Sequence, residues 1–305
     1  KFGATVKSFD ATEARKINGV VDVVQIPAGI AVVAKSTWPA IKGREALTVE
    51  WDDTRAETRS SADLFAEYRA LAETPGKTFS SEGDAGAALE KADKVIEATF
   101  EFPYLAHAPM EPHDVVIEFD GTKAEIWTGS QLQTVDQYVT STTLGIDLEN
   151  VHVHTLWAGG SFGRRAIADS HFVAEAATIA MAWGRPQPVK VVWTREDDMA
   201  GGYYRPMYVH KVKLGFDGEG GLKAWHHRIV GQSIIAGTPF EPYLVKHGID
   251  HTSVEGVEGT SYGIENFQVE LNTTKTGVPV LWWRSVGHTH TAYVMETLMD
   301  VAARE

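Results

Sequence analysis

The residues best suited to chemistry begin with a glycine-rich run. Gly159-Gly160-Ser161-Phe162-Gly163 is followed by Arg164 and Arg165, between a predicted strand at 151–156 and a predicted helix at about 165–183. Glycines let a backbone turn sharply and approach a ligand closely. A helix N-terminus offers unpaired N–H groups and a partial positive charge. The pattern predicts an anion-binding turn with two arginine donors, and the alternative is a tight strand-to-helix turn with surface arginines.

A second candidate segment is His107-Ala108-Pro109-Met110-Glu111-Pro112. Its two prolines favour an extended backbone on either side of Met110 and Glu111. The carboxylate of Glu111 could accept hydrogen bonds from the backbone N–H groups of a neighbouring loop. The alternative is a rigid loop that carries a solvated glutamate.

Gln131 follows a predicted strand at 124–128 and precedes a predicted helix at about 132–144. Because its amide both donates and accepts, it could orient an oxo or hydroxo group, although an ordinary residue at a helix start has the same pattern. Arg284 and Gly287 stand before a last helix that begins near residue 291. They repeat the order of glycine, then helix, seen in the first motif.

Composition excludes several classes of function. The chain has 305 residues, 28 basic and 41 acidic, for a net charge of −13 and a pI near 5.4, which argues against nucleic-acid binding. It has no cysteine, so a disulfide, a thiolate metal site or a cysteine-ligated iron–sulfur cluster cannot form within it. No apolar run reaches the ~18–20 residues of a membrane helix. No histidine pair has the acidic partner of a zinc motif, so we expect no metal held directly by the protein.

Strand signals dominate from residue 95 onward and are interrupted by two long helices. The predicted strands are 95–101, 115–119, 124–128, 151–156, 189–194, 208–216, 222–230 and 267–271. Two further β-branched runs, 20–26 and 30–34, are typical of a hairpin. This order predicts an α+β fold with mixed sheets and packed helices.

Taken together, the motifs resemble the molybdopterin-binding large subunit of the xanthine dehydrogenase/aldehyde oxidase family, in particular its isoquinoline 1-oxidoreductase beta-subunit branch. Gly159–Gly163 is similar to the family's Gly-Gly-Gly-Phe-Gly loop, with Ser161 in place of the third glycine. The other matching segments are Gln131, His107–Pro112, Thr194-Arg195-Glu196-Asp197-Asp198-Met199, and Arg284 with Gly287. The resemblance implies a partial α/β hammerhead-like domain at 1–52, a linker with short helices at 53–94, and the first part of a molybdopterin-binding domain at 95–305.

The resemblance also implies a function. It implies oxidative hydroxylation of an N-heterocycle or an aldehyde with water as the oxygen source. The cofactor would be molybdopterin, expected as the cytosine dinucleotide, with [2Fe-2S] clusters on a small partner subunit. Gln131 would orient an oxo group, and Arg284 and Gly287 would lie near the pterin. The cofactor loop would consist of Gly159, Gly160, Ser161, Phe162, Gly163 and Arg164.

Departures from the family pattern narrow these expectations. Ala166 and Val286 stand where purine-oxidising members carry a glutamate and an aromatic ring, which argues against purine oxidation. The family's catalytic glutamate lies beyond residue 305. Both ends look cut, so we expect a fragment of a longer polypeptide that is inactive alone. The branch implies export to the periplasm, with the cytoplasm as the alternative.

Two other classes of function stay open in the sequence. The chain could be a non-catalytic ligand-binding or assembly module that uses the same fold. A dinucleotide-binding dehydrogenase is disfavoured, because Gly-x-Gly-x-x-Gly is absent and residues 188–271 do not alternate strands with helices.

Overall fold

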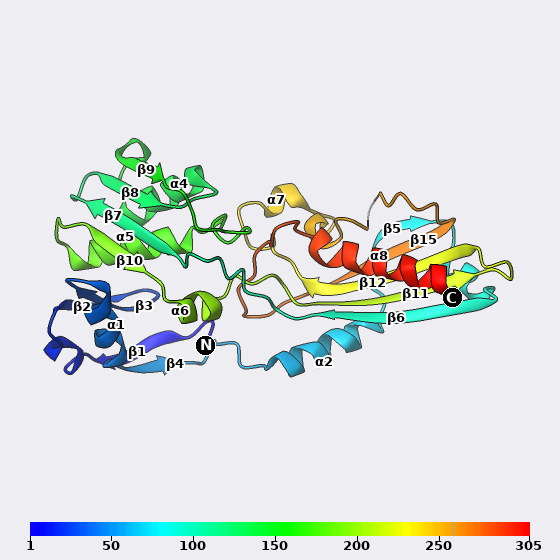
Figure 1. Cartoon of the computed structure of the whole chain (residues 1–305), viewed down its shortest axis with the longest axis horizontal. Helices are drawn as coiled ribbons and strands as arrows, with labels where there is room; N and C mark the ends of the chain where they lie inside the picture. Colours follow the sequence, from blue (N-terminus) through cyan, green and yellow to red (C-terminus); the bar gives the residue numbers. More distant parts are fainter. Residues whose placement is uncertain (258) are drawn as a thin grey trace. The chain divides into compact units, whose positions relative to one another are not determined.

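The computed structural model describes residues 1–257 and 259–305, which form two compact units (Figure 1). Unit 1 consists of residues 1–57 and 107–202, and unit 2 of residues 58–106 and 203–305. Each unit is therefore built from two separate segments of the chain. The boundaries expected from the sequence, at 52 and 94, follow the chain order and do not anticipate this interleaving.

The N-terminal part of unit 1 contains two small antiparallel pairs and one helix. The predicted hairpin is confirmed as β2 and β3. The elements are β1 (Thr5–Asp10) paired with β4 (Thr48–Asp52), β2 (Val20–Ile26) paired with β3 (Gly29–Ala34), and α1 (Thr37–Glu45). Ala11, Ala14 and Val23 form a small buried cluster among them.

The rest of unit 1 is a four-stranded mixed sheet with helices packed on it. Its order is β10-β7-β8-β9, with β8 and β9 parallel and the other neighbours antiparallel. The strands are β7 (Asp114–Phe119), β8 (Ala124–Thr128), β9 (Val151–Thr155) and β10 (Val189–Val192), and the helices are α4 (Gln133–Leu144), α5 (His171–Trp183) and α6 (Arg195–Ala200). The apolar stripe of α5, with Phe172, Val173 and Ala176 almost fully buried, packs on β7 and explains why this helix forms here.

Unit 2 is a five-stranded mixed sheet in the order β5-β15-β12-β11-β6. Only the β12–β15 pair is parallel. The strands are β5 (Lys77–Glu82), β6 (Lys94–Phe102), β11 (Tyr208–Phe216), β12 (Leu222–Gln232) and β15 (Asn266–Thr274), with short β13 (Val245–Lys246) and β14 (Ile249–Asp250); the helices are α2 (Ser61–Ala72), α3 (Ala85–Glu90), α7 (Glu241–Leu244) and α8 (His288–Arg304). The α+β fold with mixed sheets is thus confirmed in both units.

Successive residues of β11 serve two different cores, because side chains alternate between the faces of a strand. Val212 and Leu214 pack with Val294 and Leu298 of α8. Val209 belongs instead to the core that contains Leu64 and Tyr68 of α2. Figure 1 shows α8, in red, lying along the sheet.

The expected linker at 53–94 contains the predicted short helices, but it is not a linker throughout. β5 pairs antiparallel with β15, and this places the segment inside the sheet of unit 2. The prediction missed β5 because its sequence, Lys-Thr-Phe-Ser-Ser-Glu, is polar. An edge strand tolerates such a sequence, since one side of it faces water.

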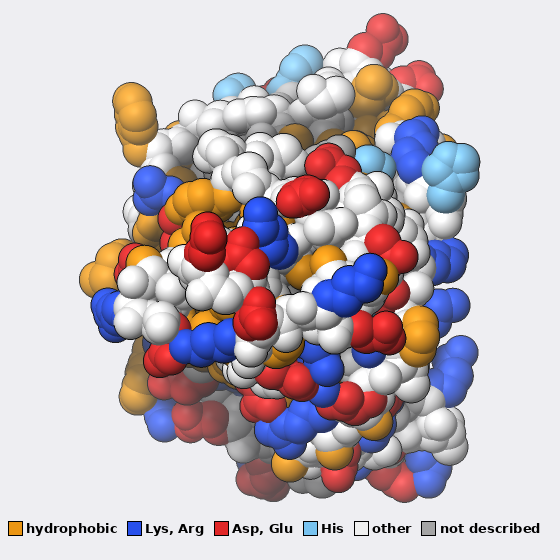
Figure 2. Space-filling model, turned by 90° about the vertical axis from the view of Figure 1, so that its right-hand side faces the viewer, with side chains coloured by type: hydrophobic (Ala, Val, Ile, Leu, Met, Phe, Trp, Pro, Cys, Tyr) orange, Lys and Arg blue, Asp and Glu red, His pale blue; other side chains and the backbone are white. Residues whose placement is uncertain are grey.

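Figure 2 shows acidic and basic side chains interspersed on one face of the molecule, with no large patch of a single sign there. Among the described residues, no helix combines the length and the apolar character that crossing a bilayer requires.

Candidate functional site

The glycine-rich turn leaves β9 and follows an unusual backbone path. Gly160 and Gly163 have φ values of 102° and 106°, and Phe162 has a φ of 58°. A bulky residue with positive φ is uncommon, and such backbone is typical of functional sites. The side chain of Phe162 is also 43% exposed. The backbone conformation of Phe162 is therefore not the one that its own side chain favours, and contacts with the rest of unit 1 must hold it.

Four successive backbone N–H groups of this turn, at 160–163, have no hydrogen-bond acceptor within the part of the chain that the structure describes. The N–H groups on either side are engaged: Gly159 donates to Glu111, and Arg164 donates to the carbonyl of Ser161. A run of free N–H groups in a glycine-rich turn forms an anion-binding concavity. This supports the predicted anion-binding turn on an observation of the structure itself.

The source of these donors differs from the prediction in one respect. We expected a helix from about residue 165, but α5 begins at His171. Ser170 precedes it in the left-handed region, with a φ of 46°. The hydroxyl groups of Ser170 and Ser130 both donate to the buried carboxyl of Asp136, and burial raises the pKa of that carboxyl. The residues between the turn and His171 therefore do not start the helix. The free N–H groups at 160–163 belong to the turn itself and not to a helix N-terminus.

Two residues, Glu111 before the glycine-rich turn in the sequence and Arg165 after it, hold the turn in place. Oε2 of Glu111 accepts from the N–H of Gly159 at 2.9 Å, and the N–H of Glu111 donates to the carbonyl of Gly159 at 3.1 Å. Nη2 of Arg165 donates to Oε1 of Glu111 at 2.6 Å. The expected role of Glu111 as an acceptor for a neighbouring loop is confirmed. We call Glu111, Gly159 and Arg165 together the Glu111 clamp.

Arg165 is completely buried, and its side chain reaches two other segments of unit 1, at 111–112 and at 129. Besides Glu111, its guanidinium donates to the carbonyl of Pro112 at 3.3 Å and to that of Gly129 at 3.2 Å. The alternative of a surface arginine is therefore wrong for this residue. A planar guanidinium spreads five N–H donors over three nitrogens, whereas a lysine has three donors on a single nitrogen. The role of Arg165 could be recognised only from its contacts.

Gln131 lies against the turn through Ser161. The hydroxyl of Ser161 donates to Oε1 of Gln131 and accepts from the N–H of Arg165 at 2.9 Å. The side-chain Nε2 group of Gln131 has no acceptor among the residues described, and Gln131 is exposed. An amide N–H₂ group is thus presented beside the free N–H groups of the turn.

Arg164, the expected cofactor ligand next to the turn, is buried. Its Nη2 lies 3.2 Å from Nε2 of His171, and its guanidinium lies 5.7 Å from the ring centroid of Trp193. Burial and the charge of Arg164 hold the pKa of His171 well below its usual range. The side chain of Arg164 therefore faces the interior of unit 1, and its contribution to cofactor binding stays a prediction.

The expected segment 194–199 contains the N-cap and most of α6 (Arg195–Ala200), which supports the same region. Thr194 and Asp197 form a capping box at the helix start. Arg195 is bonded to Asp198 at 2.7 Å and donates to the carbonyls of Pro109 and Met110. Because Met110 precedes Glu111, these bonds from Arg195 fix the loop segment that carries Glu111.

Arg284 and Gly287 belong to unit 2. Ser285 and Val286 between them have φ values of 72° and 47°. The N–H of Gly287 donates to Oε2 of Glu255 at 3.1 Å, and a Cβ at this glycine would lie 2.3 Å from the carbonyl oxygen of Thr252. Glycine is thus required here for close packing. The guanidinium of Arg284 is exposed and has no acceptor in the described part of the chain.

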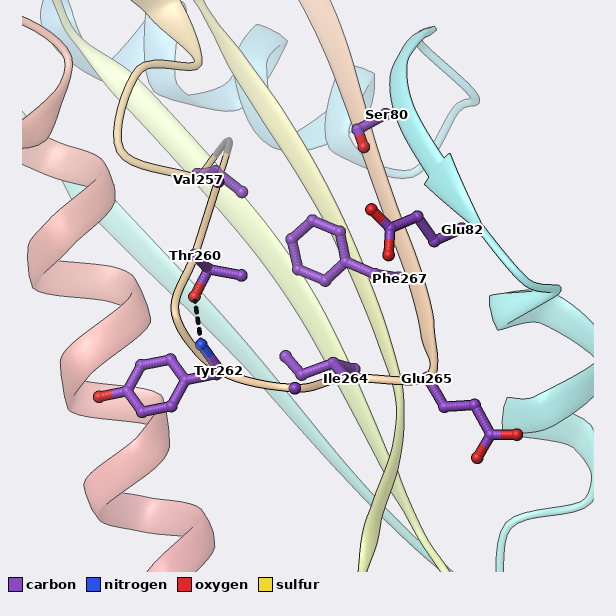
Figure 3. Close-up of a pocket in the computed structure, with 10 residues that line it drawn as sticks. Ser80, Glu82, Val257, Thr260, Tyr262, Ile264, Glu265 and Phe267 are labelled. Carbon is purple, nitrogen blue, oxygen red and sulfur yellow. Dashed lines mark hydrogen bonds between the residues drawn. The ribbon is translucent and has the colours of Figure 1, made fainter.

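A pocket of 380 Å³ in unit 2 contains none of the predicted site residues. It is lined by Ser80, Glu82, Val257, Gly259, Thr260, Tyr262, Gly263, Ile264, Glu265 and Phe267. Figure 3 shows the Glu82 carboxylate beside the Phe267 ring and the Glu265 carboxylate turned away from both. Its charged side chains are acidic, so it does not suit an anion. The described residues also contain no cluster of three or more histidine and acidic side chains arranged for a metal ion.

The sequence matches the family profile of the molybdopterin cofactor-binding domain over residues 71–305. The chain belongs to this family. It is therefore related to the large subunits of the xanthine dehydrogenase/aldehyde oxidase family, as the motifs predicted.

Individual relatives support this assignment. The chain is 27% identical to the isoquinoline 1-oxidoreductase subunit beta of Brevundimonas diminuta, over 99% of this chain and 39% of that protein. It is 27% identical to a membrane-bound aldehyde dehydrogenase [pyrroloquinoline-quinone] of Gluconacetobacter polyoxogenes, over 99% of this chain and 41% of that protein. Its fold is similar to that of quinoline 2-oxidoreductase from Pseudomonas putida 86, with a TM-score of 0.74, 21% identity, and coverage of 99% of this chain and 43% of that one. The chain thus spans about two fifths of the length of these relatives.

Proposed function

We propose that this chain supplies one side of the molybdenum-cofactor site of a hydroxylase that acts on an N-heterocycle or an aldehyde. The observation that carries the proposal is the run of four free N–H groups at 160–163 with the Gln131 amide beside it. This arrangement occurs in a chain of the molybdopterin cofactor-binding family. The enzyme would use water as the source of the oxygen that it adds.

The residues present fit such a group. Molybdopterin carries a phosphate and binds a metal with oxygen ligands, and both ends need hydrogen-bond donors. Gly160, Ser161, Phe162 and Gly163 offer backbone N–H groups without internal acceptors. When bound, the cofactor supplies the two-electron oxidation of the substrate, and the protein supplies position and hydrogen bonds.

The chain's own residues give the site its rigidity. Glu111 holds Gly159 through two hydrogen bonds: its carboxylate accepts from the N–H of Gly159, and its own N–H donates to the carbonyl of Gly159. Arg165 is anchored by carbonyls as well as by Glu111, so the turn cannot shift without breaking several bonds. Donors fixed in this way lose little free energy to reorganisation when charge develops near them. Gln131 would direct its N–H₂ group at an oxygen ligand, and Arg284 would lie near the pterin.

The substrate class rests on two residues and on the names of relatives. Ala166 and Val286 lack the carboxylate and the ring that purine-oxidising members use, so a purine is disfavoured. The names of the two relatives above refer to isoquinoline and to aldehydes. We propose the cytosine dinucleotide form of the cofactor, a small [2Fe-2S] partner subunit as the electron acceptor, and a periplasmic location. Detection of the enzyme in the cytosol alone would reject the last of these.

The deciding experiment is metal and cofactor analysis of the enzyme that contains this chain, expressed together with its neighbouring genes. We expect molybdenum and a pterin in amounts close to one per chain. Absence of both would overturn the proposal. Because one relative is named for pyrroloquinoline quinone, the assay should include that quinone, and its presence in place of molybdenum would assign a different cofactor. A loaded protein without turnover on heterocycles or aldehydes would favour a non-catalytic binding module.

A further inference from the structure

Ser161 departs from the family's glycine, and the structure gives this departure a role. A glycine at this position would have no side chain to reach Gln131. The hydroxyl of Ser161 lies between two partners, the side-chain Oε1 of Gln131 and the backbone N–H of Arg165. These contacts join residues 30 positions apart in the sequence.

The hydrogen-bond count determines which end of the Gln131 amide faces Ser161. A serine hydroxyl has one proton and two lone pairs. One lone pair accepts from the N–H of Arg165 at 2.9 Å, so the proton is the group left to satisfy. Of the two polar atoms of the Gln131 amide, only the oxygen can accept it, and Oε1 is the atom that lies there. With the amide reversed, N–H₂ would face the hydroxyl, and the proton of Ser161 would lose Oε1 as its acceptor.

The backbone on both sides of this contact is also tied down. The N–H of Gln131 donates to the carbonyl of Arg165 at 3.4 Å, and Arg165 itself is held by the Glu111 clamp. Ser161 therefore bonds Gln131 from a rigid base, although the Gln131 side chain is exposed and otherwise free to rotate. An exposed glutamine without such a bond samples several rotamers.

We propose that Ser161 is a positioning residue that fixes the Gln131 side chain with its N–H₂ group directed away from Ser161. Gln131 then acts as a hydrogen-bond donor and not as an acceptor. The consequence for turnover rests on the proposed function, because it requires an oxygen ligand that receives this donor. The orientation itself does not depend on the cofactor.

The test compares Ser161→Ala and Ser161→Thr with the unchanged enzyme that contains this chain. Threonine keeps the hydroxyl and serves as the conservative rescue. Ser141→Ala is the matched control, since Ser141 donates to the carbonyl of Ile146 at the other end of α4 and does not contact Gln131. The measurements are crystal structures, molybdenum content, and kcat and KM.

In Ser161→Ala we expect Gln131 to occupy more than one rotamer, with unchanged molybdenum content and KM. Misplacement of one donor should lower kcat by roughly ten- to a hundredfold. Ser161→Thr and Ser141→Ala should keep a single rotamer and near-normal kcat. In a Gln131→Ala background, Ser161→Ala should have no further effect, because its action passes through Gln131.

Two outcomes would overturn the inference. One is a Gln131 side chain that keeps a single unchanged rotamer in Ser161→Ala. The other is a double variant whose loss of kcat equals the product of the losses caused by Ser161→Ala and Gln131→Ala alone. Failure of the proposed function would give a different result, because the enzyme without any substitution would then contain neither molybdenum nor pterin. In that case the rotamer of Gln131 in Ser161→Ala still tests the role of Ser161.

Discussion

Arg165 and Glu111 form an ion pair in which Nη2 of Arg165 donates to Oε1 of Glu111 at 2.6 Å, while Oε2 of the same carboxylate accepts from the N–H of Gly159. The arginine side chain is fully buried and the glutamate side chain is 35% exposed. A single carboxylate thus links the buried cation to the glycine-rich turn. Loss of either charge should be felt in the turn as well as in the core of unit 1.

We expect Arg165→Ala to lower the stability of unit 1 by roughly 3 kcal/mol, because it removes a buried charge and leaves Glu111 unpaired. It also removes the donor that serves the carbonyls of Glu111, Pro112 and Gly129. Arg165→Lys should recover little, since one ammonium cannot reach the same set of oxygens. Urea unfolding measures both variants. Arg185→Ala, at an exposed arginine that stacks on Trp183, is the matched control and should be nearly neutral. Equal losses for the two alanine variants would contradict the prediction.

Gly159→Ala tests how closely the turn packs on the clamp. A Cβ at Gly159 would lie 2.6 Å from Cβ of Glu111, so the glutamate must move away and its bonds to the turn must break. We expect the enzyme that contains this chain to lose most of its molybdenum, measured by elemental analysis. In the control, Gly29→Ala, the nearest atom lies 3.9 Å away, and normal loading is expected. Normal loading of both variants would show that the turn tolerates the displacement.

Gln131→Ala should slow turnover with little loss of bound cofactor. The amide makes no contact that holds the turn in place apart from its bond to Ser161, so the fold and the loading should survive. Removal of one well-placed donor lowers kcat by about a hundredfold or more. Steady-state kinetics and molybdenum content are the measurements. Unchanged turnover would remove Gln131 from the site.

Three buried histidines should make the stability of unit 2 depend on pH. Nδ1 of His210 lies 2.8 Å from Nε2 of His227, and Nε2 of His210 lies 2.9 Å from Nδ1 of His290. Burial holds the pKa of His210 and of His290 well below the usual range and lowers that of His227 to about 3. Arg205 adds to the effect on His290, against which Tyr208 stacks.

The direction follows from proton binding. Above the ordinary histidine pKa of 6.5, the folded and unfolded chains are both neutral at these sites, and the stability is fully present. Below it, only the unfolded chain takes up protons, so each histidine removes up to about 1.4 kcal/mol per pH unit. The unfolding free energy of unit 2 should therefore fall steeply between pH 6.5 and pH 4. His290→Gln should reduce that slope, whereas His152→Gln, in unit 1 and outside the cluster, should not. Identical slopes would contradict the assignment.

Much of the fold follows from local patterns. The strands at 124–128 and 208–216 are found with the predicted bounds, and the other predicted strands agree to within about three residues. The β-branched and alternating sequences of these segments account for this agreement. β5 was missed because a polar edge strand carries no such pattern.

Only part of the candidate site could be predicted from the sequence in the same way. Glu111 was expected to accept hydrogen bonds from a neighbouring loop, and it accepts from Gly159. The sequence suggests Arg165 as a donor to a ligand or as a surface arginine, although it is a buried internal anchor. A sequence shows that an arginine follows a glycine turn, but it does not show which way the side chain points.

The sequence by itself determined the family, the α+β class and the order of the motifs, because these depend on residue types and on periodicities of a few positions. Only the tertiary structure decided that Arg164 and Arg165 turn inward, that α5 begins at His171, that residues 58–106 complete unit 2, and that Ser161 reaches Gln131. The physical reason is the same in each case. A buried charge or an edge strand is satisfied by partners far away in the chain, and the sequence does not reveal those partners until folding brings the segments together.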